Sequence, residues 1–258
     1  MKLSIQSALD YSFDEPTDVL LQLEVAAIPE QTIETTHIDV PACEYFARVP
    51  SQDMIGERIW IRTAGQLTVD YRATVTINRR LADFGDLPVM PPHQLPGEAV
   101  QYMLPSRYCP SDRFKTFVNA EFGAIDGSAK VFAMRDWIHD HFSYVPGSST
   151  TETTALDSFV RREGICRDYA HMMITLTRAA GIPARIASVY ALGVKPQDFH
   201  AVAEVFLGGE WHLIDPTGMA KEDGMAKIGV GRDAVDVPFL TAYGDATLNG
   251  QRISVERA

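Results

Sequence analysis

Three side chains of this sequence could together form a thiol active site: Cys166, His200 and Asp215. Cys166 precedes a long apolar segment, and a thiol in the first turn of a helix faces unpaired backbone N–H groups and the positive end of the helix dipole. Both favour the thiolate, especially beside a histidine. A carboxylate that orients the histidine completes the set that activates a cysteine. We therefore predict Cys166 as nucleophile, His200 as general base and acid, and Asp215 as the orienting group.

The helix that must carry the thiol is predicted over residues 166–181. Apolar side chains recur along it at helical spacing, and it should end at Gly181, with Pro183 two residues later. Gly164 precedes the thiol, and we expect it to adopt a turn that other residues avoid. An isolated cysteine more often serves only in packing, so the histidine and carboxylate decide the interpretation.

A hairpin is predicted to hold the other two groups. Alternating residues flank Gly208 and Gly209, a favoured two-residue turn between antiparallel strands. Counting back from this turn in steps of two places His200 and Asp215 on one face, as diagonal neighbours roughly 7–8 Å apart. Pro216 should end the strand directly after the carboxylate. A register shift of one residue would move Asp215 to the opposite face.

Three segments closely resemble the bacterial transglutaminase-like superfamily: GICRDYAHMMITLTRAAGIPAR, HAVAEVF and WHLIDPTG, within a similarity that spans roughly residues 130–218. The resemblance implies an α+β, papain-like core whose nucleophile opens a central helix packed on an antiparallel sheet. It also implies that Cys166, His200 and Asp215 occupy the family's triad positions. Many relatives carry tryptophan where this chain has Val202, which implies altered substrate shielding rather than altered proton transfer.

The reaction expected of such a site is attack of the thiolate on a carboxamide or peptide carbonyl, which gives a thioester and releases ammonia or an amine. Water as second nucleophile would make a peptidase or amidase, and an amine would make a transglutaminase. The Cys166 backbone N–H is the first candidate to stabilise the oxyanion. Trp137 or Tyr144 could be the second donor, although packing explains either residue. The expected partner is a protein or peptide substrate, and no cofactor is expected.

Two other functions remain open from the sequence. Thiolate, imidazole and carboxylate are all zinc ligands, so the same three residues could hold a metal with an open fourth position. The fold could also serve as a binding or scaffolding module with a vestigial triad. No separate metal site is expected, because His139 and His141 lie two apart on a predicted helix and point in different directions.

Several neighbouring residues are predicted to be structural. His171 lies off the helical face of Cys166, and His212 has the wrong strand parity for the site. Arg167 and Asp168 fall in the first turn of the predicted helix, where a structural ion pair is favoured over a role at the mouth of the site. Cys43 and Cys109 are expected to be unreactive thiols.

Composition narrows the class of protein. Among 258 residues, 23 lysines and arginines against 34 acidic residues give a net charge of −11, which argues against a nucleic-acid partner. The three cysteines form no CxxC pair, which argues against a disulfide framework. No signal-peptide core or apolar run of membrane-spanning length is visible, so we expect a cytoplasmic protein without a membrane partner. Oligomeric state is not predicted.

Two domains are expected: a β-sandwich-like antiparallel unit over residues 1–90, and a transglutaminase-like core over residues 91–258. Strands are predicted in the first unit from period-two alternation, at residues 17–27, 32–40 and 65–79. Proline-rich residues 81–110 should be a linker that wraps onto the core. Helices are predicted over 128–142, with Ser128 as N-cap, and over 154–162.

Overall fold

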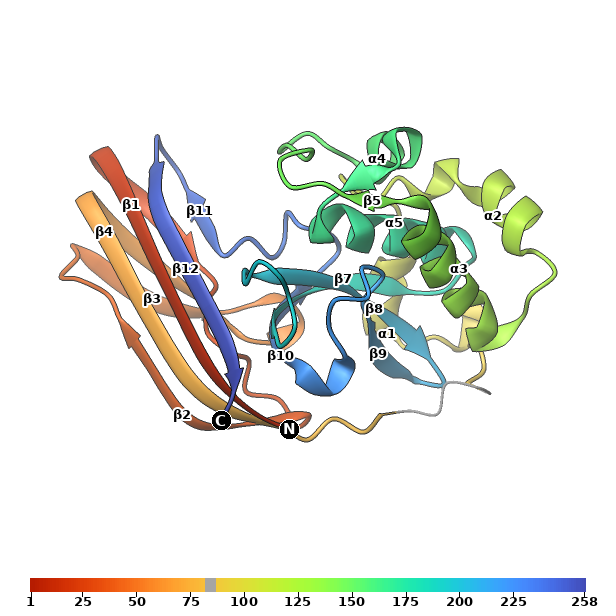
Figure 1. The fold of residues 1–258 in the computed structure, drawn as a ribbon, viewed down its shortest axis with the longest axis horizontal. Helices are drawn as coiled ribbons and strands as arrows, with labels where there is room; N and C mark the ends of the chain where they lie inside the picture. The colour runs from red at the N-terminus through yellow and green to blue at the C-terminus, as the bar shows by residue number, and fades with distance from the viewer. Residues whose placement is uncertain (82–86) are drawn as a thin grey trace.

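The computed structural model describes residues 1–81 and 87–258. Figure 1 shows two parts side by side: a sheet of long strands that contains both chain ends, and a mixed helix and sheet region. The architecture is α+β with antiparallel main sheets, so the predicted fold class is confirmed.

The part that contains the chain ends is a six-stranded antiparallel sheet, which we call the outer sheet. Its order is β11-β1-β4-β2, with β12 also paired to β1 and β3 to β4. The strands are β1 (Lys2–Leu21), β2 (Gln31–Asp39), β3 (Tyr45–Pro50), β4 (Glu57–Ile77), β11 (Leu240–Ala242) and β12 (Thr247–Arg257). The short 3-10 helix η1 (Gln52–Met54) joins β3 to β4.

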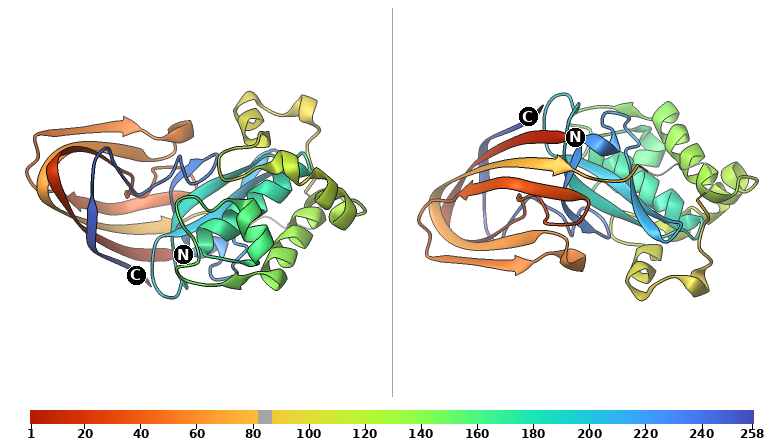
Figure 2. Two further views of the ribbon diagram at one scale, coloured as in Figure 1. Left: turned by 90° about the horizontal axis from the view of Figure 1, so that it is seen from above. Right: turned by 90° about the horizontal axis from the view of Figure 1, so that it is seen from below.

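Buried and exposed residues alternate along the first strand of the outer sheet. Along β1, Leu3, Ile5 and Leu9 are buried while most residues between them are more exposed, so one face forms an apolar core. The strand predicted over 17–27 ends at Leu21, whereas β1 itself begins at Lys2. Seen from above and below, β1 and β4 curve back at the end far from the helices (Figure 2).

The last strands of the chain belong to the outer sheet and not to the core to which residues 91–258 were assigned. β12 pairs with β1 from Leu3↔Arg257 to Ser12↔Thr247, and β11 pairs with the end of β1. The physical reason is that β4 covers only one edge of β1, so its other edge needs a partner for its backbone groups. Ile253 and Val255 join the same apolar core as the first strands.

The second part is built on a four-stranded antiparallel sheet, which we call the core sheet, in the order β10-β7-β8-β9. Its strands are β7 (Ala184–Ala191), β8 (His200–Leu207), β9 (Glu210–Ile214) and β10 (Met225–Gly231). Helix α5 (Cys166–Ala179) packs on β7 and β8, and its buried side chains share one apolar core with theirs. The predicted helix is confirmed, and Gly181 has the positive φ of a helix C-terminus.

Three more helices lie on the side of α5 away from the core sheet (Figure 1). They are α2 (Lys115–Phe122), α3 (Gly127–His141) and α4 (Ala155–Arg161), and the short strands β5 (Ser143–Tyr144) and β6 (Glu163–Gly164) pair in parallel beside them. Thr154 caps α4 through a reciprocal pair of hydrogen bonds with Asp157. Ser128 is not the N-cap of α3: the helix begins one residue earlier, and the Ser128 N–H is satisfied by the Leu87 carbonyl instead of a side chain.

Within the predicted linker 81–110, residues 82–86 lie outside the described part of the chain. The remainder contains three short helical segments: η3 (Pro92–Gln94), which is exposed, and α1 (Gly97–Val100) and η4 (Gln101–Met103), which bury Ala99 and Tyr102. Two more 3-10 turns follow at η5 (Ser111–Arg113) and η6 (Glu222–Gly224). Among the described helices, none has the length and apolar character needed to cross a membrane.

A buried cluster of charges ties the outer sheet to the core sheet. Glu204 accepts hydrogen bonds from Lys227 and from Arg185, whose Nε lies 2.7 Å away. Arg185 also reaches Asp53 in η1 at 2.8 Å, and the Tyr102 hydroxyl donates to the same carboxylate at 2.6 Å. Burial disfavours the Glu204 carboxylate, but the two cations outweigh burial and lower the pKa of Glu204 to about 2.

Candidate active site

Cys166 is the first residue of α5, as predicted, and it is half-buried. The turn before it is held by Asp168, whose carboxylate accepts hydrogen bonds from the Ile165 N–H at 2.9 Å and from the Ser149 hydroxyl at 2.9 Å. Asp168 is fully buried, and Arg167 also donates to the Ser149 hydroxyl, at 2.6 Å. The structural role predicted for these two first-turn residues therefore has a definite form: they fix the chain that presents the thiol.

Gly164 is required because a side chain at this position would collide with Asp168, and not because of its dihedral angles. Its φ is not among the positive values of the chain, so the predicted special turn is wrong. A Cβ built at this position would lie 2.6 Å from the Asp168 Cβ and 3.0 Å from its Oδ2. Glycine is needed because the Asp168 side chain folds back against the strand that leads to Cys166.

His200 and Asp215 meet as the hairpin predicts. The register runs through Leu207↔Glu210 to Ala203↔Ile214, and β9 ends just before the carboxylate. The His200 Nε2 lies 2.9 Å from Asp215 Oδ2, and both side chains are almost completely buried. The register shift that would have separated them does not occur, because the Gly-Gly turn and the buried faces fix the pairing.

Asp215 is held by four donors. Oδ1 accepts from the Thr217 N–H at 2.9 Å and from its hydroxyl at 2.7 Å, and Oδ2 accepts from His200 and from the Ala220 N–H at 3.0 Å. Burial disfavours the ionised carboxylate, but the hydrogen bond and charge of His200, together with Thr217, outweigh it and lower the pKa of Asp215. The group is therefore a fixed carboxylate at neutral pH.

The bond to Asp215 leaves the other ring nitrogen of His200 for the thiol. Nδ1 is buried and has no hydrogen-bond partner among the described residues. Burial alone would lower the pKa of His200, but the hydrogen bond with Asp215 and the interaction with the Cys166 side chain raise it to about 10. The structure thus brings all three predicted residues together, in the order thiol, imidazole and carboxylate.

Tyr144 adds a hydroxyl beside the thiol. It ends β5, which pairs with the strand that leads directly into Cys166. Burial, followed by the charge of the Cys166 side chain, raises the pKa of Tyr144 to about 12, while a hydrogen bond with the Cys166 backbone opposes the rise. Tyr144 therefore keeps its O–H at neutral pH. Trp137, the other candidate donor, instead packs in an aromatic cluster with Phe117 and Phe159.

Comparison with known proteins decides the family. The family model of the transglutaminase-like superfamily matches residues 117–216. The crystal structure of a Cytophaga hutchinsonii protein, described as a "putative cysteine protease", is 30% identical with a TM-score of 0.92, over 99% of this chain and 90% of the other. The chain belongs to the transglutaminase-like superfamily.

Two mycobacterial proteins share a shorter stretch with this member of the superfamily. ML0607 of Mycobacterium leprae is 31% identical over 119 residues, which cover 43% of this chain and 42% of that protein. Rv2569c of Mycobacterium tuberculosis is 32% identical over 118 residues, with 40% and 38% covered. The match thus spans less than half the length of these curated relatives.

Val202, the position at which the sequence resemblance implies tryptophan in many relatives, lies in the core. Val202 is fully buried and packs with Ala187, Val189 and Leu213 on the face of the core sheet opposite α5. At this position the side chain is therefore part of the packing beneath the site.

The histidines discounted from the sequence have visible structural contacts. His171 is fully buried, accepts from the Ala234 N–H at 3.1 Å and stacks on Tyr108, and burial lowers the pKa of His171 to about 3. His141 stacks on Trp137, and His212 is 3.2 Å from the Leu207 carbonyl.

The two other thiols differ in their surroundings. Cys109 is fully buried, and burial raises the pKa of Cys109 to about 12. Cys43 is half-buried and packs against the outer-sheet core. In the described residues, no group of three or more histidine, cysteine or acidic side chains has a geometry that could hold a metal ion.

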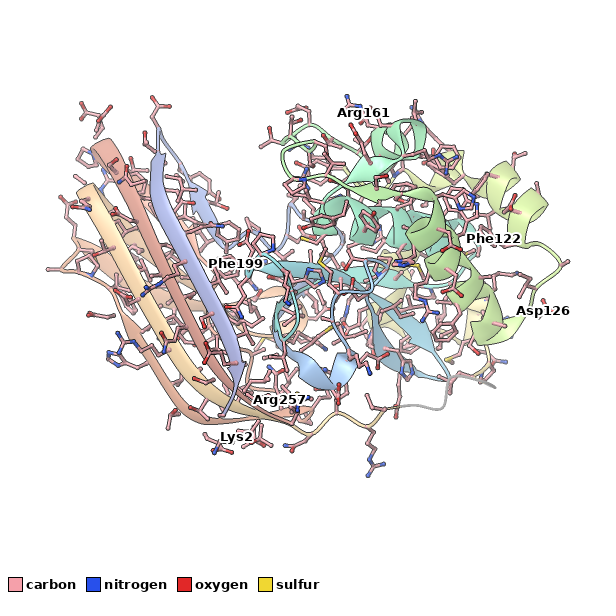
Figure 3. All side chains as sticks on the ribbon, viewed as in Figure 1. Lys2, Phe122, Asp126, Arg161, Phe199 and Arg257 are labelled. Atoms are coloured by element: carbon pink, nitrogen blue, oxygen red, sulfur yellow. The ribbon has the colours of Figure 1, made fainter. Side chains whose placement is uncertain are left out.

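One acidic residue near the site was missed from the sequence. Asp198, two residues before His200, accepts hydrogen bonds from the Phe199 N–H at 2.7 Å and from Gln251 of β12 at 2.9 Å. The Phe199 ring stacks on Phe239 at 4.4 Å, where the outer sheet meets the core sheet (Figure 3). No periodicity marks this segment in the sequence; its only signal was its nearness to the histidine.

Proposed function

We propose that the protein is a thiol enzyme that cleaves or transfers the acyl group of a protein or peptide amide. The observation that carries this proposal is the arrangement of Cys166, His200 and Asp215, in which a buried carboxylate fixes the imidazole and leaves its other nitrogen for the thiol. Such an arrangement is the one that activates a cysteine nucleophile. Membership of the superfamily supports the same reaction class.

In the proposed reaction, the Cys166 sulfur attacks the carbonyl carbon, and the carbonyl oxygen becomes an oxyanion. Protonated His200 then gives its proton to the leaving nitrogen, so that the C–N bond breaks and a thioester forms as ammonia or an amine departs. Next, His200 accepts a proton from water or from an amine, which attacks the thioester and releases Cys166. Asp215 orients the ring and stabilises the imidazolium throughout.

The oxyanion is proposed to bind between two donors: the backbone N–H of Cys166 and the hydroxyl of Tyr144. The position of Tyr144 beside Cys166 and its raised pKa support this assignment, since the phenol stays protonated. A neutral donor fixed in place before the reaction stabilises developing charge without reorganisation.

The choice of acceptor and substrate is tested by mass spectrometry. The protein is incubated with a labelled primary amine and a panel of peptides, with Cys166→Ala as the control. Incorporation of the amine identifies a transglutaminase, and cleavage identifies a peptidase or amidase. Neither product above the Cys166→Ala background would contradict the proposal and favour a binding or scaffolding module.

Thiol reactivity tests the site without knowledge of the substrate. We expect iodoacetamide to alkylate Cys166 far faster than Cys43 or Cys109 near neutral pH, and His200→Ala to slow it. Equal rates at all three cysteines would count against catalysis. Metal analysis of the purified protein tests the zinc alternative in the same preparation.

The cellular location and the role of the outer sheet are also proposals. We propose a cytoplasmic protein in which the outer sheet helps to present the substrate, a role supported by the bond from Gln251 of β12 to Asp198, two residues before His200. Cell fractionation followed by immunoblotting tests the location, and detection with the membrane or secreted fraction would overturn it.

A further inference from the structure

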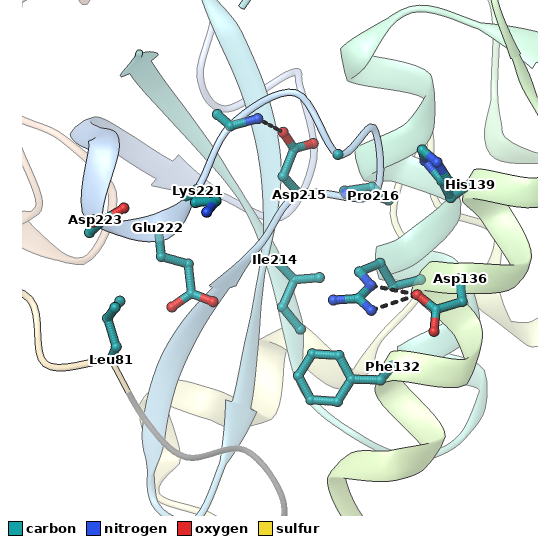
Figure 4. Close-up of a pocket in the computed structure, with 13 residues that line it drawn as sticks. Leu81, Phe132, Asp136, His139, Ile214, Asp215, Pro216, Lys221, Glu222 and Asp223 are labelled. Atoms are coloured by element: carbon teal, nitrogen blue, oxygen red, sulfur yellow. Dashed lines mark hydrogen bonds and ion pairs between the residues drawn. The ribbon is translucent and has the colours of Figure 1, made fainter. Parts of the chain in front are cut away.

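A cavity lies beside the turn that holds Asp215 (residues 215–220), which we call the catalytic turn. It has a volume of about 650 Å³ and is bounded by α3 on one side and by the chain from Ile214 to Asp223 on the other (Figure 4). Asp215 of the candidate active site lines this cavity, whereas Cys166 and His200 do not. Its wall includes Pro216, Gly218 and Ala220, which belong to the turn that holds Asp215.

The cavity combines apolar surface with two carboxylates that have no hydrogen bond or ion pair among the described residues, those of Glu222 and Asp223. Phe132, Ile214 and Pro216 supply apolar surface, and the Glu222 carboxylate lies beside Ile214 and across from Phe132 (Figure 4). That carboxylate accepts no hydrogen bond and forms no ion pair with any residue in the described ranges. Burial raises the pKa of Glu222 to about 7, against the effect of Arg79 and with a further rise from Asp223.

The cations that line the cavity do not neutralise Glu222. Arg135 donates twice to Asp136, at 2.8 and 2.6 Å, so its charge is already matched at the rim. Lys221 is exposed and makes no ion pair within residues 1–81 and 87–258. The net charge of −11 on the whole chain also favours a positive ligand.

We propose that this cavity binds an organic cation on an apolar stem, with an ammonium, guanidinium or amidinium group on Glu222 and the stem against Phe132 and Ile214. A charge-assisted hydrogen bond to a partly buried carboxylate supplies specificity, and the apolar surface supplies contact area. The same chemistry belongs to a lysine or arginine side chain of a peptide and to a free alkylamine.

The cavity is lined in part by the catalytic turn, which holds Asp215. The backbone N–H groups of Thr217 and Ala220 donate to the Asp215 carboxylate, and Asp215, Pro216 and Ala220 line the cavity. A ligand in the cavity therefore contacts the segment that fixes the orienting carboxylate.

The test is isothermal titration of the full chain with benzamidine at pH 8, where Glu222 is mostly ionised. Benzyl alcohol is the neutral control and benzoate the anionic one. We expect benzamidine to bind and both controls to bind at least about 10-fold more weakly. Glu222→Gln should weaken benzamidine binding by about 10-fold or more, whereas the matched Glu121→Gln, at an exposed position of α2 outside the cavity, should change it by less than about threefold.

A second variant separates a loss of binding from a loss of the folded state. Glu222→Asp keeps the charge but withdraws it by one methylene, and we expect intermediate affinity with an unchanged melting temperature. Titration with hexylamine and with an acetylated lysine amide distinguishes a free amine from a peptide side chain. No binding at millimolar benzamidine, equal affinity in folded Glu222→Gln, or tighter binding of benzoate would overturn the proposal.

Discussion

Replacing Asp215 with asparagine keeps the shape of the side chain and removes its charge. All four groups around the carboxylate are donors: His200 and the Ala220 N–H at Oδ2, and the N–H and hydroxyl of Thr217 at Oδ1. An amide has one oxygen, so in either orientation its NH₂ faces two donors. When the NH₂ stands in the place of Oδ2, His200 can pair with it only through an unprotonated Nε2, which moves the ring proton to Nδ1. The nitrogen on the thiol side then cannot accept the thiol proton.

The expected loss follows from this change of tautomer. Removing the charge of an orienting carboxylate in a catalytic triad lowers kcat by about 10⁴-fold, which corresponds to about 5.5 kcal/mol. We expect a loss of that order for Asp215→Asn in the amine-incorporation or cleavage assay. The effect on alkylation is smaller because two effects oppose each other. Loss of the imidazolium lowers the thiolate fraction, since an ordinary thiol is only about 0.3% ionised at pH 6. The thiolate that does form is more nucleophilic than a stabilised one. The alkylation rate should therefore fall on the order of 10-fold at pH 6.

The assay measures each cysteine separately by peptide mass spectrometry after timed exposure to iodoacetamide at pH 6. Cys43 in the same molecule is the internal standard because it is half-buried and remote from the site. Asp70→Asn, on the exposed surface of β4, is the matched control and should leave the rates unchanged. An unchanged ratio of Cys166 to Cys43 in folded Asp215→Asn would refute the reasoning.

Three further variants test other parts of the structure. Gly164→Ala should cost about 1–3 kcal/mol in the free energy of unfolding by urea, since its Cβ has no room; an unaltered midpoint would contradict this. Glu204→Gln leaves two buried cations without their carboxylate and should cost about 3–5 kcal/mol, with exposed Glu210→Gln as control. Because the folded pKa of Glu204 is lowered to about 2, its stabilisation is complete above pH 4.5 and lost only as pH falls towards 2, so the cost should be equal at pH 5 and 7. Tyr144→Phe should slow acyl transfer by about 10²-fold and change Cys166 alkylation less than threefold; parallel losses would argue against an oxyanion role.

The site could be predicted from the sequence because its geometry is set locally. The Gly208–Gly209 turn fixes the register of the hairpin, and the parity of the two strands then places His200 with Asp215. The helix start before an apolar stripe likewise places Cys166. Neither inference needs knowledge of distant contacts.

The rest depended on contacts that no local pattern carries. Gly164 cannot be replaced because the Asp168 side chain folds back against it. At the start of α3, the Ser128 N–H donates to the Leu87 carbonyl, which lies far earlier in the chain. In β12 only Ile253 and Val255 are buried, so its sequence gives a weak strand pattern and does not indicate that β1 is its neighbour. Asp198 is connected to Gln251 across 53 positions of sequence.

The pairing of the first strand with the last has a consequence for biosynthesis. Lys2 and Arg257 lie close together (Figure 3), and the Ala258 N–H donates to the Lys2 carbonyl at 3.1 Å. One edge of β1 therefore stays bare on the ribosome until β12 emerges, while the thiol-bearing part between them is already complete. A chain that stops before residue 240 should expose that edge and aggregate rather than yield a smaller active enzyme.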